Sequence, residues 1–462
     1  MSEELSTTNR EQRTEIERPP LSVKIIFAIG QLGWSLASFG ALNLLIYFYM
    51  PPEDGKTDFP DYIFQGNILL GLTIIGLISF GGRIFDAFTD PFIANLTDKS
   101  TSKFGKRKRF MAIGAVPFAV FSVLIFYPIG GTDMMLNTAW LVLMCALFFF
   151  FFTVYVVPYN ALIGELGHHP KDRMLISTLI SVTFALGFVL GGMAYTMQSH
   201  FEGTGLSSAE AFQISMVILA CIALVCMLVP VFFLNENRYC KQTNSAIGFI
   251  ESGKIVWQNK NFRYFVFSDL TYWLAVTIIQ TGVIYYTTIL LGLEKDVASL
   301  FGAIAFPLSF ALYIPINLAV ARFGKKKIIN LGFLLFACAF LLTFFLGKIP
   351  ISPMLQLMAV IVIAAFPLAI FGIIPTAIIA DEVNRQTDEN GDSQAAMYFG
   401  FRTFMMKLGV SLALLIFPTL LNFGKSADND FGVRLTAIAA FAFCLLGWFL
   451  FRNYKEVNAT EL

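Results

Sequence analysis

The chain has 462 residues, of which 56% are hydrophobic and only 14% are charged, and its formal net charge is +1. A soluble domain carries about 25% charged residues, so this composition excludes an ordinary water-soluble protein and predicts one that resides in a bilayer. The sequence has no basic stripe with interleaved aromatic residues, so nucleic-acid binding is not predicted. Residues 1–20 are polar and lack the apolar region of a cleavable signal peptide, so we expect a disordered cytoplasmic tail.

Twelve apolar segments follow, each about twenty residues or more in length and therefore able to cross a bilayer as a helix. They lie near 22–50, 66–97, 109–128, 138–163, 173–198, 211–234, 262–291, 297–321, 327–346, 353–380, 393–421 and 431–451. We expect an N-terminal six-helix bundle at 21–237, a cytoplasmic linker at 238–261, a C-terminal six-helix bundle at 262–452 and a cytoplasmic tail at 453–462. The six cysteines show no metal-site spacing, so neither a zinc site nor a disulfide framework is predicted.

Two short basic loops set the expected orientation and reveal an internal repeat. Residues 104–108 read Phe-Gly-Lys-Arg-Lys, and residues 323–327 repeat this as Phe-Gly-Lys-Lys-Lys, each after the second span of its half. Because basic residues gather in cytoplasmic loops, we expect both loops and both termini to lie inside the cell. A parallel repeat of two six-helix halves, with the substrate bound at the midplane between them, is typical of the major facilitator fold. The sequence therefore predicts an all-α membrane protein with that fold.

The second apolar segment contains three ionisable side chains, Arg83, Asp86 and Asp90. Charged groups inside a bilayer cost about 2.5–3.5 kcal/mol each on insertion scales, so they are rare there and usually mark an ion or substrate path. Their spacing places all three on one face of a helix. They could form an ion pair that only neutralises buried charge. Two neighbouring carboxylates can also bind Na⁺, Li⁺ or H⁺, and we favour this cation site.

Two further charged positions lie inside later apolar segments. Lys407 is in the middle of the eleventh segment, too deep for its ammonium group to reach the interface easily. A buried lysine needs a partner, and the carboxylates of Asp86 and Asp90 are the obvious ones. Lys407 would then compete with the coupling ion or help to close the pathway between the halves. Asp269, early in the seventh segment, either lines the cavity or faces the cytoplasmic rim near Arg263.

At these residues the chain resembles the glycoside–pentoside–hexuronide:cation symporter family of the major facilitator superfamily. In the first half the matching residues are Arg83, Asp86, Asp90, Pro91, Asp98, Gly105 to Arg109, Val157-Pro158-Tyr159 and Ala161-Leu162. In the second half they are Asn261-Phe262-Arg263, Gly324-Lys325-Lys326, Ala380-Asp381 and Lys407-Leu408-Gly409. The resemblance implies a secondary active transporter that couples the entry of Na⁺, Li⁺ or H⁺ to solute uptake by alternating access.

The melibiose permeases of this family bind the cation with two second-helix aspartates and a fourth-helix threonine, which implies the ligands Asp86, Asp90 and Thr153 here. The family's eleventh-helix lysine matches Lys407. A third acid of the melibiose permeases, three residues after that threonine, falls on Val156, and most of their sugar contacts are replaced in this chain, at Trp34-Ser35, Asn160, Ser181 and Gly372. The chain thus keeps much of the cation site and loses most of the charged and aromatic sugar contacts. The vertebrate sodium-dependent lysophospholipid symporters also resemble this family, so an amphipathic substrate is the alternative.

We therefore predict a symporter of a sugar or glycoside, with Na⁺ or H⁺ bound by Asp86, Asp90 and Thr153 and with Arg83 and Lys407 balancing or gating that charge. The expected substrate cavity comprises polar and aromatic positions inside the spans, namely Gln31, Trp34, Ser35, Asn43, Tyr159, Asn160, Tyr272, Trp273 and Gln280. A symporter of lysophospholipids or other amphiphiles, or a passive facilitator, is the alternative.

An enzyme is not predicted, because the sequence shows no nucleophile–base or metal constellation. We expect a monomer in the cell membrane, surrounded by membrane lipid, with no cofactor and no metal beyond the coupling cation.

Overall fold

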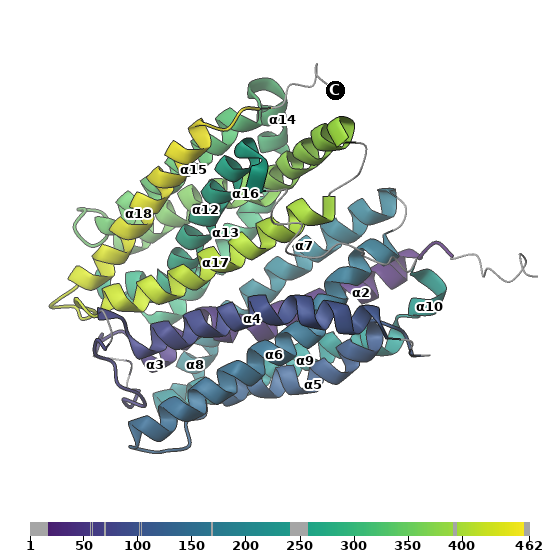
Figure 1. Cartoon of the computed structure of the whole chain (residues 1–462). Coiled ribbons are helices and arrows are strands. Elements are labelled where there is room, and N and C mark those ends of the chain that lie inside the picture. Colours follow the sequence, from purple (N-terminus) through teal and green to yellow (C-terminus); the bar gives the residue numbers. More distant parts are fainter. Residues whose placement is uncertain are drawn as a thin grey trace, which may run out of the picture.

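The computed structural model describes residues 17–55, 57, 59–68, 71–100, 102, 104–167, 170–240, 257–390 and 395–456. These residues form helices, with two isolated β-bridges outside them (Figure 1). The first half contains α2 (Leu21–Phe39), η1 (Gly40–Leu44), α3 (Leu45–Tyr49), α4 (Ile74–Asp98), α5 (Lys108–Leu124), α6 (Met134–Leu166), α7 (Pro170–Gly192), α8 (Ala194–Glu202), α9 (Ser208–Phe233) and α10 (Glu236–Tyr239). The second half contains α12 (Lys260–Tyr285), η3 (Tyr286–Leu290), η4 (Lys295–Ala298), α13 (Ser299–Ala311), α14 (Tyr313–Phe323), α15 (Lys325–Phe344), α16 (Pro353–Asn390), α17 (Ala395–Leu421) and α18 (Phe431–Arg452).

Most of these helices are long and apolar enough to cross a membrane. In the described part of the chain nine meet that condition, and a pair bent by 47°, Lys295–Ala311 with Tyr313–Phe323, would make a tenth. The other two predicted spans are α4 and α5. The middle of α4 carries the charged cluster, and α5 has only 17 residues. Both pack against α6 of the same half, so the described helices arrange as the expected six plus six.

The same helix contacts recur in the two halves. In the first half α2 packs on α9 and α5 on α6, and in the second half the equivalent α12 packs on α18 and α15 on α16. The helices α2 and α9 approach closely at Gly33, where a Cβ atom would lie 2.6 Å from the carbonyl oxygen of Ala223 and from the amide nitrogen of Met227. Small residues allow such close packing between membrane helices. The repeat in the sequence is therefore a repeat in the structure.

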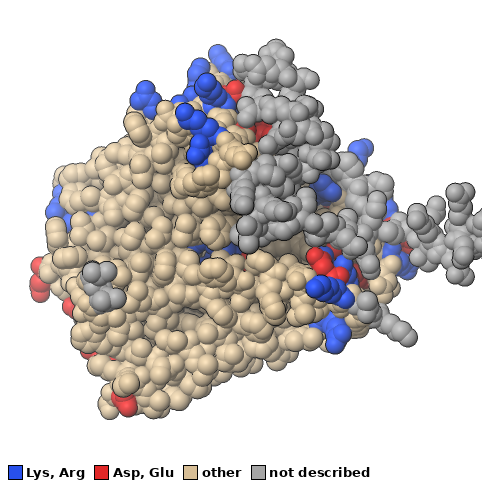
Figure 2. Space-filling model, in the orientation of Figure 1, with Lys and Arg blue, Asp and Glu red and all other residues tan. Residues whose placement is uncertain are grey.

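Charged side chains gather at the two ends of the helices, and a broad band of uncharged atoms separates them (Figure 2). Large apolar side chains lie exposed on the helices, among them Ile314, Leu318 and Val225, which are 73%, 68% and 65% accessible. Monomeric soluble proteins rarely expose large contiguous apolar surfaces. Together with the long apolar helices, this surface identifies a multi-pass membrane protein.

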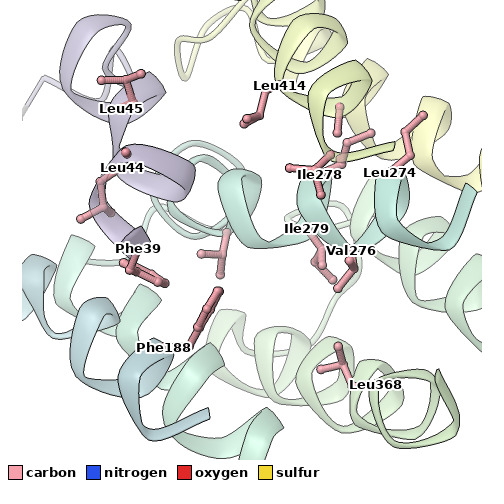
Figure 3. Packing of buried hydrophobic residues seen from close by; sticks show 14 of the residues in the cluster. Phe39, Leu44, Leu45, Phe188, Leu274, Val276, Ile278, Ile279, Leu368 and Leu414 are labelled. Carbon is pink, nitrogen blue, oxygen red and sulfur yellow. The ribbon is translucent and has the colours of Figure 1, made fainter. Parts of the chain in front are cut away.

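The two halves meet where α4 packs on α17 and where α7 packs on α13 (Figure 1). Apolar side chains of both halves are buried in the region between them, including Phe39 and Phe188 of the first half and Ile278 and Leu414 of the second (Figure 3). The contact between α4 and α17 brings the charged face of α4 against the helix that carries Lys407.

The predicted tails and linker lie partly outside the described residues, at 1–16, 241–256 and 457–462. Inside the described part, α12 begins at Lys260, two residues before the predicted start of the second bundle. Arg18, which belongs to the predicted N-terminal tail, forms an ion pair with Asp172 of α7 at 2.6 Å. The tail residues nearest to α2 are thus attached to the first half.

Candidate functional site

The charged face of α4 forms the centre of the site. Arg83, Asp86 and Asp90 lie on that face, as their spacing predicted, and Asp86 is completely buried. A guanidinium nitrogen of Arg83 lies 3.1 Å from Oδ2 of Asp86, one turn further along the helix. Phe149 of α6 lies beneath the guanidinium group, 5.8 Å from ring centroid to Cζ. The buried carboxylate is therefore held in place by its own helix and by α6.

Lys407 of α17 reaches this cluster from the other half of the molecule. Its ammonium nitrogen lies 2.8 Å from Oδ2 of Asp86 and 2.5 Å from Oδ2 of Asp90. One lysine thus bridges both carboxylates, as its position in the sequence predicted. With Arg83, the cluster contains two positive and two negative groups and is electrically balanced.

Two hydroxyl groups complete the polar surroundings of Asp86. Thr153 of α6 donates a hydrogen bond to Oδ1 of Asp86 at 2.8 Å, and Thr89 of α4 lies 3.1 Å from the Thr153 hydroxyl group. Thr89 also donates to the main-chain carbonyl oxygen of Asp86 at 3.1 Å. Thr89 is not among the site residues predicted from the sequence, although it lies one turn after Asp86 and could have been found from that spacing. Carboxylate and hydroxyl oxygens together form a donor set suited to a hard cation.

The two carboxylates differ in exposure. The side chain of Asp86 is fully buried, whereas that of Asp90 is 30% accessible. Asp90 lies one turn nearer to the end of α4 that leads into the basic loop at 104–108. A cation that enters or leaves from that end meets Asp90 first and Asp86 second.

A second buried pair joins α12 to α17 inside the second half. The carboxylate of Asp269 accepts two hydrogen bonds from the guanidinium group of Arg402, at 2.9 and 3.2 Å. The Asp269 side chain is 2% accessible and is paired with Arg402 of α17. The sequence did not predict this partner, and both alternatives for Asp269 remain predictions. The pair attaches α17 to its own half, while Lys407 attaches the same helix to the other half.

The expected cavity residues fall into two groups. Five are buried in contacts with neighbouring groups. For example, Tyr159 donates to the carbonyl oxygen of Phe27 at 2.7 Å, and Tyr272 stacks on Phe371 with ring centroids 4.1 Å apart. The others in this group are Gln31, Ser35 and Asn43. Of the other four, Trp34, Trp273 and Gln280 are partly buried and Asn160 is exposed.

Trp34 and Trp273 are partly buried, and their indole nitrogens are buried and have no hydrogen-bond partner within the described residues. Trp34 lies on α2 and Trp273 on α12, the equivalent first helices of the two halves. An indole N–H group can only donate a hydrogen bond. Each N–H group would gain a partner only if an acceptor atom reached it in another conformation of the helices.

Comparison with known proteins agrees with this architecture. Residues 27–451 match the family model described as MFS/sugar transport protein. The isoprimeverose transporter of Lactiplantibacillus pentosus is 23% identical over 78% of this chain and 74% of its own length. The sodium-dependent lysophosphatidylcholine symporter 1 of Xenopus tropicalis is 23% identical over 93% of this chain and 86% of its own length.

Solved structures share the fold at low sequence identity. A D-xylose–proton symporter superposes with a TM-score of 0.67 at 13% identity, covering 94% of this chain and 98% of its own. The nucleoside transporter NupG gives a TM-score of 0.66 at 12% identity, covering 95% and 99%. The fold and the relatives define a membrane transporter of the major facilitator superfamily, not an enzyme. Within that class, the chain belongs to the MFS/sugar transport family, that is, the glycoside–pentoside–hexuronide symporters.

Proposed function

We propose that this transporter is a cation-coupled symporter in which Asp86, Asp90 and Thr153 bind the coupling cation. The observation that carries the proposal is the position of the Lys407 ammonium group, 2.8 Å from Asp86 and 2.5 Å from Asp90. A monovalent cation at that position would have oxygen ligands from both carboxylates, with the Thr153 hydroxyl group beside Asp86. The bound ammonium group therefore supports a site for one positive charge.

Charge balance supports alternate occupancy of this site by lysine and by the cation. With Lys407 in place, the two carboxylates are balanced by Lys407 and Arg83. A cation that bound beside the lysine would add an unpaired charge in a buried region, at a cost of several kcal/mol. Cation binding therefore requires Lys407 to withdraw. That withdrawal removes an ion pair between α4 and α17, and so between the halves.

The exchange of lysine for cation would couple ion binding to alternating access. When the cation and solute are bound, the carboxylates are neutralised by the cation. After both have left, Lys407 returns and neutralises the carboxylates in the empty carrier. In either case the carrier changes conformation without uncompensated carboxylates, which would be costly to bury.

We propose Na⁺ as the first candidate for the coupling cation, with Li⁺ and H⁺ as the alternatives. A proton needs only one carboxylate oxygen, whereas a metal cation needs several oxygen ligands. The hydroxyl groups of Thr153 and Thr89, 3.1 Å apart beside Asp86, supply additional oxygens. This arrangement favours a metal cation.

For the solute, we propose a sugar or glycoside that binds near the midplane against Trp34, Asn160, Trp273 and Gln280. The indole N–H groups of the two tryptophans are buried without a partner, and the hydroxyl oxygens of a sugar would satisfy them if the helices separate when the solute binds. A lysophospholipid is the second candidate, because a lysophosphatidylcholine symporter aligns with 93% of this chain. We place the protein in the cell membrane with both termini inside. Because one chain contains both halves and the whole cation site, we propose that the monomer is sufficient.

The test is uptake into proteoliposomes that contain the purified full-length protein. An inward Na⁺ gradient is compared with K⁺ and H⁺ gradients, using labelled sugars, glycosides and one lysophospholipid. We expect a sugar or glycoside to accumulate above its equilibrium level only with the Na⁺ gradient. Accumulation of the lysophospholipid alone would replace the sugar assignment. Equilibration of a solute without accumulation under any gradient would indicate a facilitator and contradict symport.

The matched variant is Asp90→Asn, which removes one of the two carboxylates but keeps the size of the side chain. We expect it to abolish accumulation while solute still equilibrates across the membrane at saturating concentration. Accumulation equal to that of the unmodified protein would show that Asp90 is not a cation ligand.

A further inference from the structure

A second set of contacts between the halves lies at the outer end of the helices, which is the end opposite the basic loops at 104–108 and 323–327. Two ion pairs join the halves there. Lys295 of η4 pairs with Glu202 at the end of α8, and Lys425, after α17, pairs with Glu53, after α3. Neither pair involves the residues of the proposed cation site.

The Glu202–Lys295 pair is largely buried and is connected to the core of the first half. The Lys295 ammonium nitrogen donates to Oε1 of Glu202 at 2.5 Å, and the lysine side chain is 8% accessible. The same carboxylate oxygen accepts a hydrogen bond from Gln198 at 3.0 Å, and Gln198 accepts one from the Tyr47 hydroxyl group at 2.9 Å. Both Gln198 and Tyr47 are fully buried. This lysine is therefore inserted into a prepared polar site of the opposite half.

The Glu53–Lys425 pair is supported by the main chain. Lys425 lies 3.1 Å from Glu53 and donates to the carbonyl oxygen of Pro51 at 2.9 Å. The amide group of Glu53 in turn donates to the carbonyl oxygen of Lys425 at 2.9 Å. The lysine side chain is 10% accessible, whereas that of Glu53 is 62% accessible. Here too the lysine of the second half is buried by the first.

The two pairs are related by the internal repeat. Glu53 follows the first span and Lys295 follows the seventh, while Glu202 follows the fifth span and Lys425 follows the eleventh. Exchanging the halves therefore converts one pair into the other. In both pairs the acid belongs to the first half and the lysine to the second. The pair of Lys407 with the α4 carboxylates has the same polarity.

Packing between the two ion pairs closes the outer end. The Tyr285 hydroxyl group of α12 donates to the carbonyl oxygen of Met50 at 2.7 Å, and both residues are completely buried. The rings of Phe188 of α7 and Phe306 of α13 lie 5.9 Å apart. At the basic end, by contrast, the described ion pairs lie within one half, such as Arg107 with Glu165. The structure is thus closed at the outer end.

From this arrangement we propose that Glu202–Lys295 and Glu53–Lys425 are the two latches of an external gate. Both latches hold the halves together while the transporter faces inward, and both separate when it opens outward and the four side chains become hydrated. Because each half contributes groups of one sign only, a single charge reversal places two like charges in contact. Swapping both charges of a pair restores the attraction.

The test measures the distance between the halves at the outer end by double electron–electron resonance. Spin labels are attached at Met135 and Ile351, which are 85% and 50% accessible, in the full-length chain with its native cysteines replaced. Glu202→Lys and Lys295→Glu are measured singly and together, in nanodiscs without substrate or Na⁺. We expect each single reversal to raise the ratio of open to closed molecules by about tenfold or more, and the swap to return it to within about twofold.

Lys348→Glu is the matched control, because Lys348 is an exposed lysine at the outer end of the same half and lies over the ring of Phe344 of its own half. It should leave the distance distribution unchanged. The thermal unfolding midpoint of each variant is recorded beside the distances. Single reversals that fold normally but stay closed would overturn the gate, and so would a swap that fails to restore closure. Because neither cation nor substrate is present, this result is independent of the proposed symport.

Discussion

The charged groups at the basic end and those at the proposed cation site are paired in different ways. At the basic end, an acidic residue near the end of each bundle accepts hydrogen bonds from the basic loop of its own half. Glu236 accepts hydrogen bonds from the amide groups of Arg107 and Lys108, at 3.0 and 2.9 Å. Glu456 accepts one from the amide group of Lys325 at 2.6 Å. Each acid thus binds the first residues of a basic helix that belongs to the same bundle.

At the proposed cation site, by contrast, two aspartates share one lysine, and that lysine comes from the other half. The Lys407 side chain is 10% accessible and that of Asp90 is 30% accessible, so this ion pair is partly accessible to solvent. A charge that is satisfied within its own half stabilises the fold in every conformation. A charge shared between the halves could be exchanged for a cation, as we propose for Lys407. We infer that the first kind serves stability and the second serves transport, and the following changes test that separation.

The largest effect is expected for Asp86→Asn. The change removes the buried carboxylate that contacts Arg83, Lys407 and Thr153. Breaking a buried ion pair costs about 3–5 kcal/mol of folding free energy, because the partner charge is left uncompensated. We also expect accumulation driven by the cation gradient to disappear. Unfolding midpoints and proteoliposome uptake check the two parts, and normal accumulation by a folded variant would count against the site.

The next largest effect is expected in the basic loop at 104–108, whose backbone binds Glu236. Gly105 has a φ angle of +117°, and a Cβ atom there would lie 2.4 Å from a carboxylate oxygen of Glu236. Gly105→Ala should therefore lower the free energy of unfolding by about 2–3 kcal/mol. Gly131→Ala is the matched control, because Gly131 has a φ angle of +55° with open space around it. That control should cost about 1 kcal/mol. The affinity for the cation should not change in either variant. A tenfold change of that affinity in Gly105→Ala would contradict the proposal that charges paired within one half serve stability and not transport.

The Asp269–Arg402 pair tests the same rule inside the second half. Asp269→Asn leaves the Arg402 guanidinium group, which is 18% accessible, without its carboxylate partner. We expect a loss of about 1–3 kcal/mol in unfolding free energy, since a partly buried charged donor then loses its carboxylate acceptor. The apparent affinity for the coupling cation should stay within about twofold, because Lys407 keeps its own partners. Equilibrium unfolding and cation titration of transport measure these two quantities.

The smallest effect is expected at the hydroxyl ligand. Thr153→Val removes the hydrogen bond to Asp86 at 2.8 Å and keeps the shape of the side chain. The lost interaction is worth about 1 kcal/mol, which corresponds to a weakening of cation affinity of about fivefold. Thr153→Ser keeps the hydroxyl group and should retain most of the affinity. Equal affinities for the valine and serine variants would remove Thr153 from the set of ligands.

Much of the fold and the centre of the site could be predicted from the sequence, and the reasons are physical. Charged side chains inside apolar segments are costly, so Arg83, Asp86 and Asp90 indicate a functional site, and their helical spacing predicts that they share one face. Lys407 was assigned to the two aspartates because a buried ammonium group needs an acid. The repeated basic loops at 104–108 and 323–327 revealed the two halves.

Other contacts could not be predicted, because they join distant positions through groups that carry no pattern. Arg402 is 133 residues from Asp269, and Glu236 is 129 residues from Arg107. Neither pair leaves a signal in the spacing of the chain. The cavity residues posed a further difficulty, because a membrane helix is apolar on its lipid face and on its protein face alike. The sequence therefore could not separate Tyr159, which is buried in helix packing, from Trp34, which is partly exposed.

The most direct test of the central claim is equilibrium binding of the coupling cation to purified Lys407→Gln. If Lys407 and the cation occupy one site in turn, removing the ammonium group leaves the two carboxylates with only Arg83 to balance them. The variant should then bind Na⁺ about tenfold more tightly than the unmodified protein, a gain of about 1.4 kcal/mol, while it loses coupled accumulation. An unchanged or weaker affinity for Na⁺ in a folded Lys407→Gln variant would contradict the account.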